Sequence, residues 1–196
     1  MSLVQKIRCR RDIPVWLKEE RFQIIAEVGV RSGDHLRSLL RSQPKHLVAV
    51  DLWDDDGVLA HNDSKTSPEQ IRRCHESVLQ IASANPCVDV RQGLSDSVAQ
   101  QFAPGYFDFV YLDADHTYEG VTTDIAAWWP KVRRGGVLGG HDYILRRNPH
   151  GVVFGVVPAV HEFLGRSHLQ SSFHCTWPDE QPGNWFVRKP LDWRDS

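Results

Sequence analysis

Residues 22–35, FQIIAEVGVRSGDH, decide the fold class of this chain. An apolar run typical of a buried strand ends in a turn that contains Gly29 and Gly33, and the next segment, 34–42, carries leucines at helical spacing. Glycine permits backbone conformations and close contacts that a Cβ atom would block. A strand that leads through such a turn into a helix predicts one β-α unit of an α/β fold.

The same alternation of strand and helix continues along the chain. We expect further strands and helices, the strands at 46–53, 87–93, 107–114 and 135–143, and the helices at 68–84, 95–103 and 118–132. Continuous apolar strands separated by helices indicate a parallel sheet with both faces covered. Near the end, two strand-like runs flank the turn-rich segment 178–183, which predicts an antiparallel hairpin.

Length and composition limit the class of protein. The 196 residues suit one domain, which we divide into an N-terminal extension, 1–20, and a core, 21–190. A net charge of -2 gives no general attraction for nucleic acid or anionic membrane, and no apolar run approaches the ~20 residues of a membrane helix. Four cysteines without C-x-x-C spacing favour reduced thiols. We therefore expect a cytoplasmic protein with no nucleic-acid or membrane partner, and we interpret Arg8, Arg10 and Arg11 as solvated surface.

The glycine turn is a candidate ligand site, because open parallel sheets bind ligands beyond the carboxyl ends of their strands. Its spacing is G-x-x-x-G, and Arg31 stands where a dinucleotide fold would need a glycine against the pyrophosphate. That departure disfavours a nicotinamide or flavin cofactor. Asp51 closes the next strand, where an acid can accept hydrogen bonds from ribose hydroxyls.

Four segments in this order resemble the motifs of class I S-adenosylmethionine-dependent methyltransferases: EVGVRSG (27–33), VAVDLW (48–53), VRQGLS (90–95) and FDFVYLDADH (107–116). The resemblance spans roughly Phe22 to Lys189. It implies a Rossmann-like α/β fold with a seven-stranded, mostly parallel sheet, a C-terminal antiparallel hairpin and helices on both faces.

The resemblance also implies a cofactor, S-adenosylmethionine, and the residues that bind it. Glu27 would lie near the ammonium group, the glycine turn under the methionine part, Asp51 at the ribose and Leu52 against the adenine. Trp53 would either flank the adenine or pack within its loop. The cofactor-binding set is Glu27, Gly29, Arg31, Gly33, Asp51, Leu52, Gly93, Ser95 and Asp113.

The residues at the ends of the fourth and fifth strands make the resemblance more specific. They are similar to those of a small single-domain subgroup related to macrolide-sugar and other natural-product O-methyltransferases. In those relatives an Asp after the fourth strand and an acidic pair after the fifth often hold magnesium. Asp113 matches the first, and His141 and Asp142 stand in place of the acidic pair. Asp113, His141 and Asp142 are therefore the candidate metal ligands, with Mg or Mn as the ion, although imidazole suits softer ions than magnesium.

The catalytic candidates are His116, His141 and Asp113, and two mechanisms stay open. In one, a divalent ion lowers the pKa of the acceptor hydroxyl. In the other, a histidine near its ordinary pKa of about 6.5 removes the proton as a general base. Asp115 orients an imidazole, helps to hold the cofactor, or caps the helix that starts near Tyr118.

The predicted function is methyl transfer from S-adenosylmethionine to a hydroxyl of a small molecule. The alternatives are a non-catalytic module that binds S-adenosylmethionine, a hydroxylase of antibiotic precursors built on this fold, and an NAD-dependent oxidoreductase. Exposed tryptophans suggest a homodimer. The polar connection 54–66 is either a lid or an exposed loop, and four residues near the pocket mouth either select the acceptor or form a solvated loop: Arg146, Arg147, Asn148 and His150.

Overall fold

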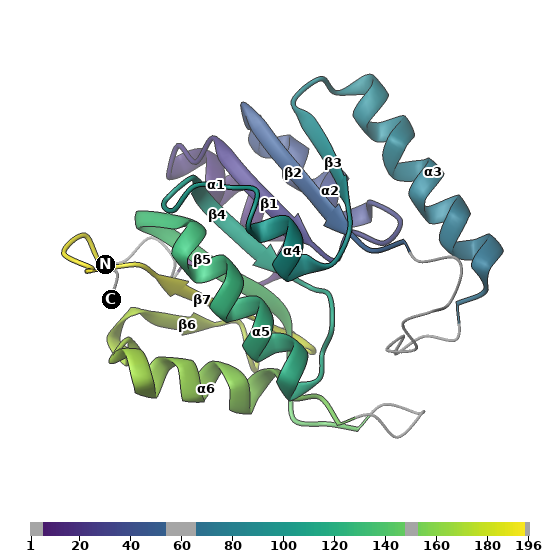
Figure 1. The fold of residues 1–196 in the computed structure, drawn as a ribbon. Coiled ribbons are helices and arrows are strands. Elements are labelled where there is room, and N and C mark those ends of the chain that lie inside the picture. The colour runs from purple at the N-terminus through teal and green to yellow at the C-terminus, as the bar shows by residue number, and fades with distance from the viewer. Residues whose placement is uncertain (1–5, 54–65, 148–152, 195–196) are drawn as a thin grey trace.

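The structure, a computed structural model, describes residues 6–53, 66–147 and 153–194 (Figure 1). Within these ranges the chain forms one seven-stranded sheet in the order β3-β2-β1-β4-β5-β7-β6. The strands are β1 Ile24–Val28, β2 His46–Asp51, β3 Val88–Gln92, β4 Phe107–Leu112, β5 Val132–Tyr143, β6 Phe173–Cys175 and β7 Gly183–Arg188. β1 to β5 pair in parallel, and β7 runs antiparallel to both β5 and β6. The predicted sheet and its C-terminal hairpin are confirmed.

Helices cover both faces of the sheet (Figure 1). They are α1 Ile13–Glu19, α2 Asp34–Leu39, α3 Pro68–Ala84, α4 Ser95–Ala99, α5 Tyr118–Trp128 and α6 Val156–Ser167, with short 3-10 turns η2 Arg10–Asp12, η3 Leu40–Ser42, η4 Trp129–Lys131 and η5 Gln170–Ser172. One core cluster joins α1, α2 and α3 to the sheet, and a second joins α4, α5 and α6 to the opposite face. No helix in the described part of the chain is long and apolar enough to cross a membrane.

Local sequence signals explain where the helices begin. Ser67 caps α3, its side chain accepts a hydrogen bond from the Gln70 amide, and Pro68 occupies the first turn, as predicted. The sequence interpretation missed α1, although Ile13, Trp16 and Leu17 have helical spacing and are all buried. The first residues of the described chain are therefore part of the core on one face.

The two-residue period of the strands sorts side chains between the two faces. On β1, Ile25 packs with α1 and α2, whereas Ala26 and Val28 pack with the α4–α6 layer. Glu27 therefore faces the same side as Ile25, and Tyr111 on β4 faces that side too. Polar residues at the ends of β1 and β4 are thus directed toward the N-terminal segment.

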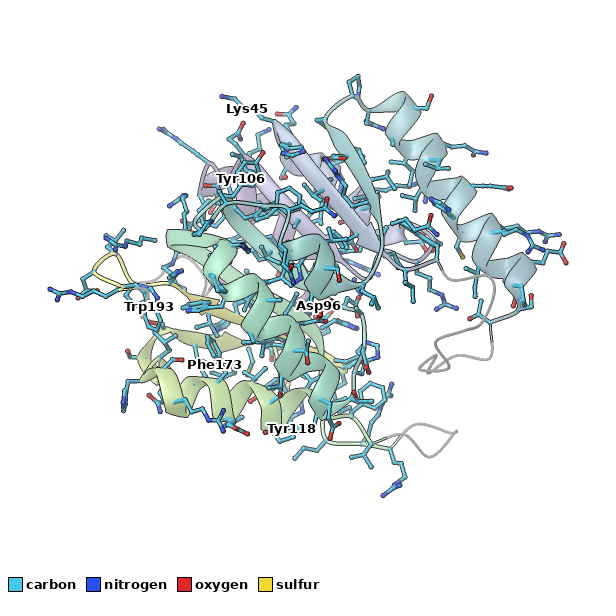
Figure 2. The ribbon with its side chains drawn as sticks, in the orientation of Figure 1. Lys45, Asp96, Tyr106, Tyr118, Phe173 and Trp193 are labelled. Carbon is cyan, nitrogen blue, oxygen red and sulfur yellow. The ribbon has the colours of Figure 1, made fainter. Side chains whose placement is uncertain are left out.

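The two ends of the sheet differ in the residues they present (Figure 2). Lys45 and Tyr106 directly precede β2 and β4 and mark the amino ends of the strands. Asp96 and Tyr118 lie in the first turns of α4 and α5, at the carboxyl ends, where parallel sheets bind ligands. Residues 54–65 of the predicted polar connection, and Asn148 and His150, lie outside the described residues.

Candidate functional site

The glycine turn connects β1 to α2 and contacts the residues that follow β4. Gly29 has φ +89°, and a Cβ atom there would overlap the carbonyl of Asp113 and the amide of Ala114. Its own amide donates to the Val50 carbonyl at 2.8 Å. Gly33 has φ +85°, and a Cβ atom there would collide with Ile81 of α3. Backbone conformation and packing therefore require glycine at both positions. The turn packs closely against the end of β4 at Gly29 and against α3 at Gly33.

Asp51 is held at the end of β2 by main-chain donors. Its Oδ2 accepts a hydrogen bond from the Arg31 amide at 2.7 Å, and its Oδ1 accepts one from the Trp53 amide at 3.2 Å. The Gly93 amide donates to the Asp51 carbonyl at 3.0 Å. These contacts fix the direction of the carboxylate and join the ends of β2 and β3.

Trp53 packs within its loop. It is 4% exposed, stacks on His75 of α3 at a centroid distance of 4.5 Å, and donates from Nε1 to the Arg31 carbonyl at 2.9 Å. Leu52 beside it is half-buried, and Gln92, which the sequence interpretation did not select, donates to the Leu52 carbonyl at 3.1 Å. The loop-packing interpretation of Trp53 therefore describes this structure.

Ser95, a predicted cofactor-binding residue, lies at the interface of α4 and α5. Its hydroxyl accepts a hydrogen bond from Trp128 Nε1 at 2.9 Å. The same hydroxyl bonds to Asp124, a buried carboxyl on α5 whose pKa is raised to about 7. Burial is the main cause of that rise, the Ser95 hydrogen bond opposes it, and the charges of Asp115 and Asp96 add to it. Ser95 thus connects the start of α4 to a buried acid.

Glu27 and His35, which we call the buried pair, lie below the glycine turn. His35 Nδ1 is 3.2 Å from Glu27 Oε1, and the two residues are 8% and 1% exposed. Burial raises the pKa of Glu27 well above its ordinary value, against the charge of Arg10, and burial lowers the pKa of His35 well below its ordinary value. Both shifts favour the uncharged forms.

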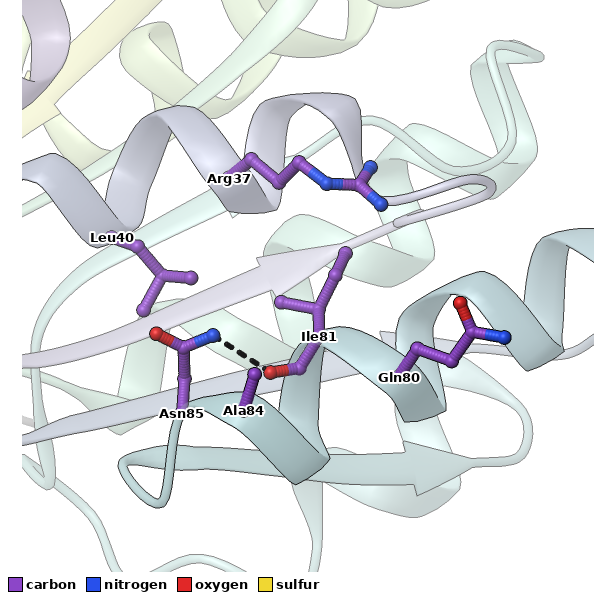
Figure 3. Close-up of a pocket in the computed structure, with 6 residues that line it drawn as sticks. All are labelled: Arg37, Leu40, Gln80, Ile81, Ala84 and Asn85. Atoms are coloured by element: carbon purple, nitrogen blue, oxygen red, sulfur yellow. Dashed lines mark hydrogen bonds between the residues drawn. The ribbon is translucent and has the colours of Figure 1, made fainter.

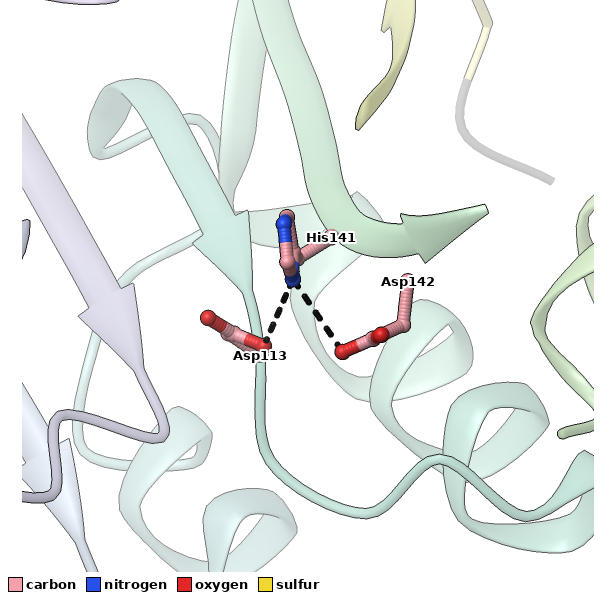
Figure 4. A group of neighbouring side chains, drawn as sticks. All are labelled: Asp113, His141 and Asp142. Carbon is pink, nitrogen blue, oxygen red and sulfur yellow. Dashed lines mark hydrogen bonds and ion pairs between the residues drawn. The ribbon is translucent and has the colours of Figure 1, made fainter. Parts of the chain in front are cut away.

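Asp113, His116, His141 and Asp142 meet where β4 and β5 end, and we call them the strand-end cluster. Figure 4 shows three of them, Asp113, His141 and Asp142. His116 Nε2 is 3.3 Å from Asp113 Oδ1 and 3.1 Å from Asp142 Oδ2. His141 Nδ1 is 3.1 Å from the same Asp142 oxygen and 3.7 Å from Asp113 Oδ1. The structure therefore brings together all three predicted metal ligands and both predicted histidines.

The carboxylates of the strand-end cluster favour the charged form. Burial alone would raise the pKa of Asp113, but the hydrogen bond from His116 and the charge of Arg10 lower it below its ordinary value. The pKa of Asp142 is lowered in the same way by His141 and His116, against the effect of burial. Asp142 also has φ +52° at the end of β5, a strained conformation of the kind that concentrates at functional sites.

His116 is held by the segment that contains Phe154 and Gly155. Its ring stacks on Phe154 at a centroid distance of 5.3 Å, and its carbonyl accepts a hydrogen bond from the Gly155 amide at 2.8 Å. Asp115 instead accepts from the Thr117 amide at 2.8 Å, and Thr117 caps α5 through the Gly120 amide. The N-cap of α5 is therefore Thr117, and the prediction that Asp115 caps this helix is wrong; Asp115 instead holds the amide of the capping residue.

Arg10 reaches this site, although the sequence interpretation assigned it to solvated surface. Its Nη2 donates to Asp113 Oδ2 at 2.7 Å, and its guanidinium lies 5.1 Å from the centre of the Tyr111 ring. The side chain is 27% exposed. Nothing in the basic cluster Arg8–Arg11 distinguishes Arg10, because its partners are more than a hundred positions away along the chain.

Comparison with known proteins gives the family. A sequence family described as "Methyltransferase domain" matches residues 26–143, more than half of the chain. The chain belongs to this methyltransferase family. Among curated protein sequences, none matches.

Solved structures share the methyltransferase fold at low sequence identity. An O-methyltransferase from Bacillus cereus in complex with S-adenosylhomocysteine is 18% identical, with a TM-score of 0.62 over 96% of this chain and 82% of that one. A putative caffeoyl-CoA O-methyltransferase from Staphylococcus aureus is 13% identical, with a TM-score of 0.64 over 92% and 82%. The O-methyltransferase TomG from Streptomyces achromogenes, in complex with S-adenosylmethionine, is 14% identical, with a TM-score of 0.60 over 92% and 79%. The predicted class I methyltransferase fold is confirmed.

The strand-end cluster of this methyltransferase fits a divalent ion. One ligand atom each from Asp113, His141 and Asp142 lies within 4.8 Å of the others. Ligand atoms on a tetrahedral ion with bonds of ~2.0–2.1 Å stand about 3.3–3.4 Å apart. The separations of 3.1 and 3.7 Å around His141 Nδ1 bracket that value. A mixed set of oxygen and imidazole ligands suits manganese, iron or zinc better than magnesium.

The buried pair fits the ammonium group of an amino-acid-like cofactor. Oε2 of Glu27 is buried and has no hydrogen-bond partner among the described residues. A buried carboxylate oxygen is normally paired, and an ammonium group would pair it.

A shallow groove of about 390 Å³ lies elsewhere, between α2 and α3, and its lining has no carboxylate and imidazole cluster like those described above (Figure 3). Its lining is Arg37, Leu40, Gln80, Ile81, Ala84 and Asn85, and no predicted site residue contributes to it.

Proposed function

We propose that this methyltransferase moves the methyl group of S-adenosylmethionine to a hydroxyl of a small molecule at the strand-end cluster. The observation that carries the proposal is the convergence of two carboxylates and two imidazoles at the ends of β4 and β5. The cluster lies against the glycine turn, through the contact of Gly29 with Asp113. The net charge of -2 favours a small-molecule acceptor over nucleic acid.

Three side chains would hold different parts of the cofactor. Asp51 would accept hydrogen bonds from the ribose hydroxyls, because the Arg31 and Trp53 amides already fix its carboxylate. Leu52, half-buried beside it, would contact the adenine. Glu27, with its unpaired Oε2, would bind the ammonium group. When bound, the cofactor supplies an electrophilic methyl group on a positively charged sulfur.

The reaction forms a bond between the acceptor oxygen and the methyl carbon and breaks the bond between that carbon and sulfur. The sulfur leaves as a neutral thioether, and the hydroxyl proton must be removed. The protein therefore has to align the hydroxyl with the methyl group and to stabilise or accept charge at the oxygen. Asp113 belongs to the strand-end cluster and its backbone contacts the glycine turn, so it is placed to contribute to both tasks.

In the mechanism we favour, Asp113, His141 and Asp142 would hold a divalent ion. Such an ion would lower the pKa of a bound hydroxyl. The lowered pKa values of Asp113 and Asp142 keep both carboxylates charged and ready to bind a cation. His116, which contacts both Asp113 and Asp142, would serve as a further ligand or accept the hydroxyl proton.

A second mechanism needs no ion, and the contacts of His116 support it as the alternative. Its Nε2 lies within 3.3 Å of both Asp113 and Asp142, and Phe154 holds the ring flat. A carboxylate beside an imidazole stabilises the imidazolium that forms when the ring accepts a proton. In this mechanism His116 is the general base.

Methyl transfer assays on a panel of phenols, catechols and sugar hydroxyls test the proposal. We expect activity that falls in chelator and returns with manganese, and a loss of roughly 100-fold or more in Asp113→Asn. Asp89→Asn, at a partly exposed site on β3, is the matched control and should keep full activity. Activity that is indifferent to chelator but lost in His116→Asn would select the second mechanism. Unchanged activity in Asp113→Asn would refute both.

A further inference from the structure

The N-terminal segment is attached to the hairpin of β6 and β7. The carboxylate of Glu180 accepts hydrogen bonds from the Arg10 amide at 2.9 and 3.1 Å. The carbonyl of Ile7, a buried residue, lies 2.7 Å from His174 Nε2. Glu180 also accepts from Asn184, whose side-chain oxygen accepts from the Tyr111 hydroxyl. These contacts fix the backbone of Arg10 relative to β4.

From this position the guanidinium of Arg10 extends over the end of β4. Nη2 donates to Asp113 Oδ2, and the Tyr111 ring lies beneath. Nε is buried and donates to no group in the part of the chain that the structure describes. A guanidinium has five N–H donors in a planar fork that matches a carboxylate. Arg10 thus keeps donors for a second anion beside Asp113.

Glu27 of the buried pair offers the complementary group, a carboxyl oxygen that can accept a hydrogen bond. Its Oε2 is the counterpart of Arg10 Nε, since both are buried without a partner among the described residues. The charges of Arg10 and Glu27 each act on the other. A ligand that carries a carboxylate and an ammonium group on neighbouring atoms would satisfy both residues at once.

We infer that Arg10 binds the carboxylate of the amino-acid end of the cofactor while Glu27 binds its ammonium group. The inference rests on the proposed function and adds a specificity residue to it. The N-terminal segment thereby supplies part of the cofactor site, and a ligand without the carboxylate is discriminated against. Arg10 contacts the ligand at a distance from the reacting methyl group and takes no part in proton removal.

Calorimetric titration with two probes tests the inference. S-adenosylhomocysteine carries the complete amino-acid group, and decarboxylated S-adenosylhomocysteine keeps the amine but lacks the carboxylate. We expect Arg10→Gln to weaken the first probe by roughly 10- to 100-fold and to leave the second almost unchanged. Arg10→Lys keeps the charge beside Asp113 and serves if the Gln variant unfolds; we expect it to show the same selective loss to a smaller degree. Arg8→Gln, on the same segment but exposed, is the matched control and should bind both probes like the wild type.

Each contrary result has a distinct meaning. An equal loss for both probes would assign Arg10 a structural role only, and no loss for either would remove it from the site; both overturn the inference. Wild-type protein that binds the two probes equally tightly would overturn the inference and leave the proposed function standing. Wild-type protein that binds neither probe would overturn both.

Discussion

The buried pair and the strand-end cluster use the same two chemical groups, carboxylate and imidazole, at similar distances. His35 and Glu27 are 3.2 Å apart, and His116 and Asp113 are 3.3 Å apart. Yet the pKa of Glu27 is raised and that of Asp113 is lowered. The chemical type of a residue therefore does not decide its charge at this end of the sheet.

The difference comes from the surrounding charges. Asp113 is paired with Arg10 and contacts two imidazoles, whose combined effect exceeds the cost of burial. Glu27 is more deeply buried, and its imidazole partner is itself driven to the neutral form. We infer that one site is prepared to receive a cationic group from a ligand and the other to keep its carboxylates charged.

Replacing Gly29 by Ala should have the largest effect, because Gly29 closely follows Glu27 of the buried pair in the chain and packs against the backbone of Asp113 in the strand-end cluster. The new Cβ would overlap the Asp113 backbone, and φ +89° is unfavourable for alanine. We expect a loss of about 4 kcal/mol or more in the free energy of unfolding, measured by urea denaturation. The control is Gly165→Ala on α6, where a Cβ would meet nothing within 4 Å and helix propensity should add about 0.5–1 kcal/mol. Similar stabilities for the two variants would contradict this account.

Asp124 is a third buried carboxyl group, and it tests whether burial alone can raise a pKa as it does for Glu27. Few positive charges near Asp124 oppose the effect of burial. Its pKa of about 7 in the folded protein exceeds the ordinary value, so the folded state binds the proton more tightly. The resulting stability is present below about pH 4 and is lost as pH rises through about 7. Between pH 5 and pH 8, wild type should therefore lose about 3 kcal/mol relative to Asp124→Asn.

Urea denaturation at the two pH values measures this difference. Asp179→Asn, at an exposed site, is the matched control. Parallel pH profiles for wild type and Asp124→Asn would show that burial does not set the protonation of this carboxyl.

Asp142→Asn should have the smallest of these three effects and acts on the strand-end cluster alone. Asparagine tolerates positive φ, so the backbone at φ +52° is preserved while the charge is removed. We expect the affinity for Mn²⁺, followed by titration of the metal alone, to fall roughly 10- to 100-fold, with Asp89→Asn as control. Equal affinity in wild type and variant would exclude Asp142 as a ligand.

Local sequence patterns predicted most of the fold. The apolar runs located the strands of the parallel sheet, Ser67 and Pro68 marked the start of α3, and the turn at 178–183 located the hairpin. Asp113 directly follows β4, and His141 and Asp142 lie near the end of β5, its neighbour in the sheet, so adjacent strand ends predict that they meet.

Features that depend on tertiary contacts were not predictable in this way. Arg10 lies 103 positions from Asp113, and no local pattern connects them. Trp53 follows a predicted ligand-binding acid, but its packing on His75 of α3 becomes visible only in the folded chain. The helix α1 did have a periodic signal, in Ile13, Trp16 and Leu17. The helix has only seven residues, so this signal covers few positions and is weak.

Calorimetric titration of the wild-type protein with S-adenosylhomocysteine and with NAD tests the central claim most directly. We expect S-adenosylhomocysteine to bind at one site per chain and NAD to give no heat, because Arg31 occupies the position where a dinucleotide fold has glycine. Preference for NAD, or no binding of S-adenosylhomocysteine, would contradict the assignment of the glycine turn, Asp51 and Glu27 to this cofactor.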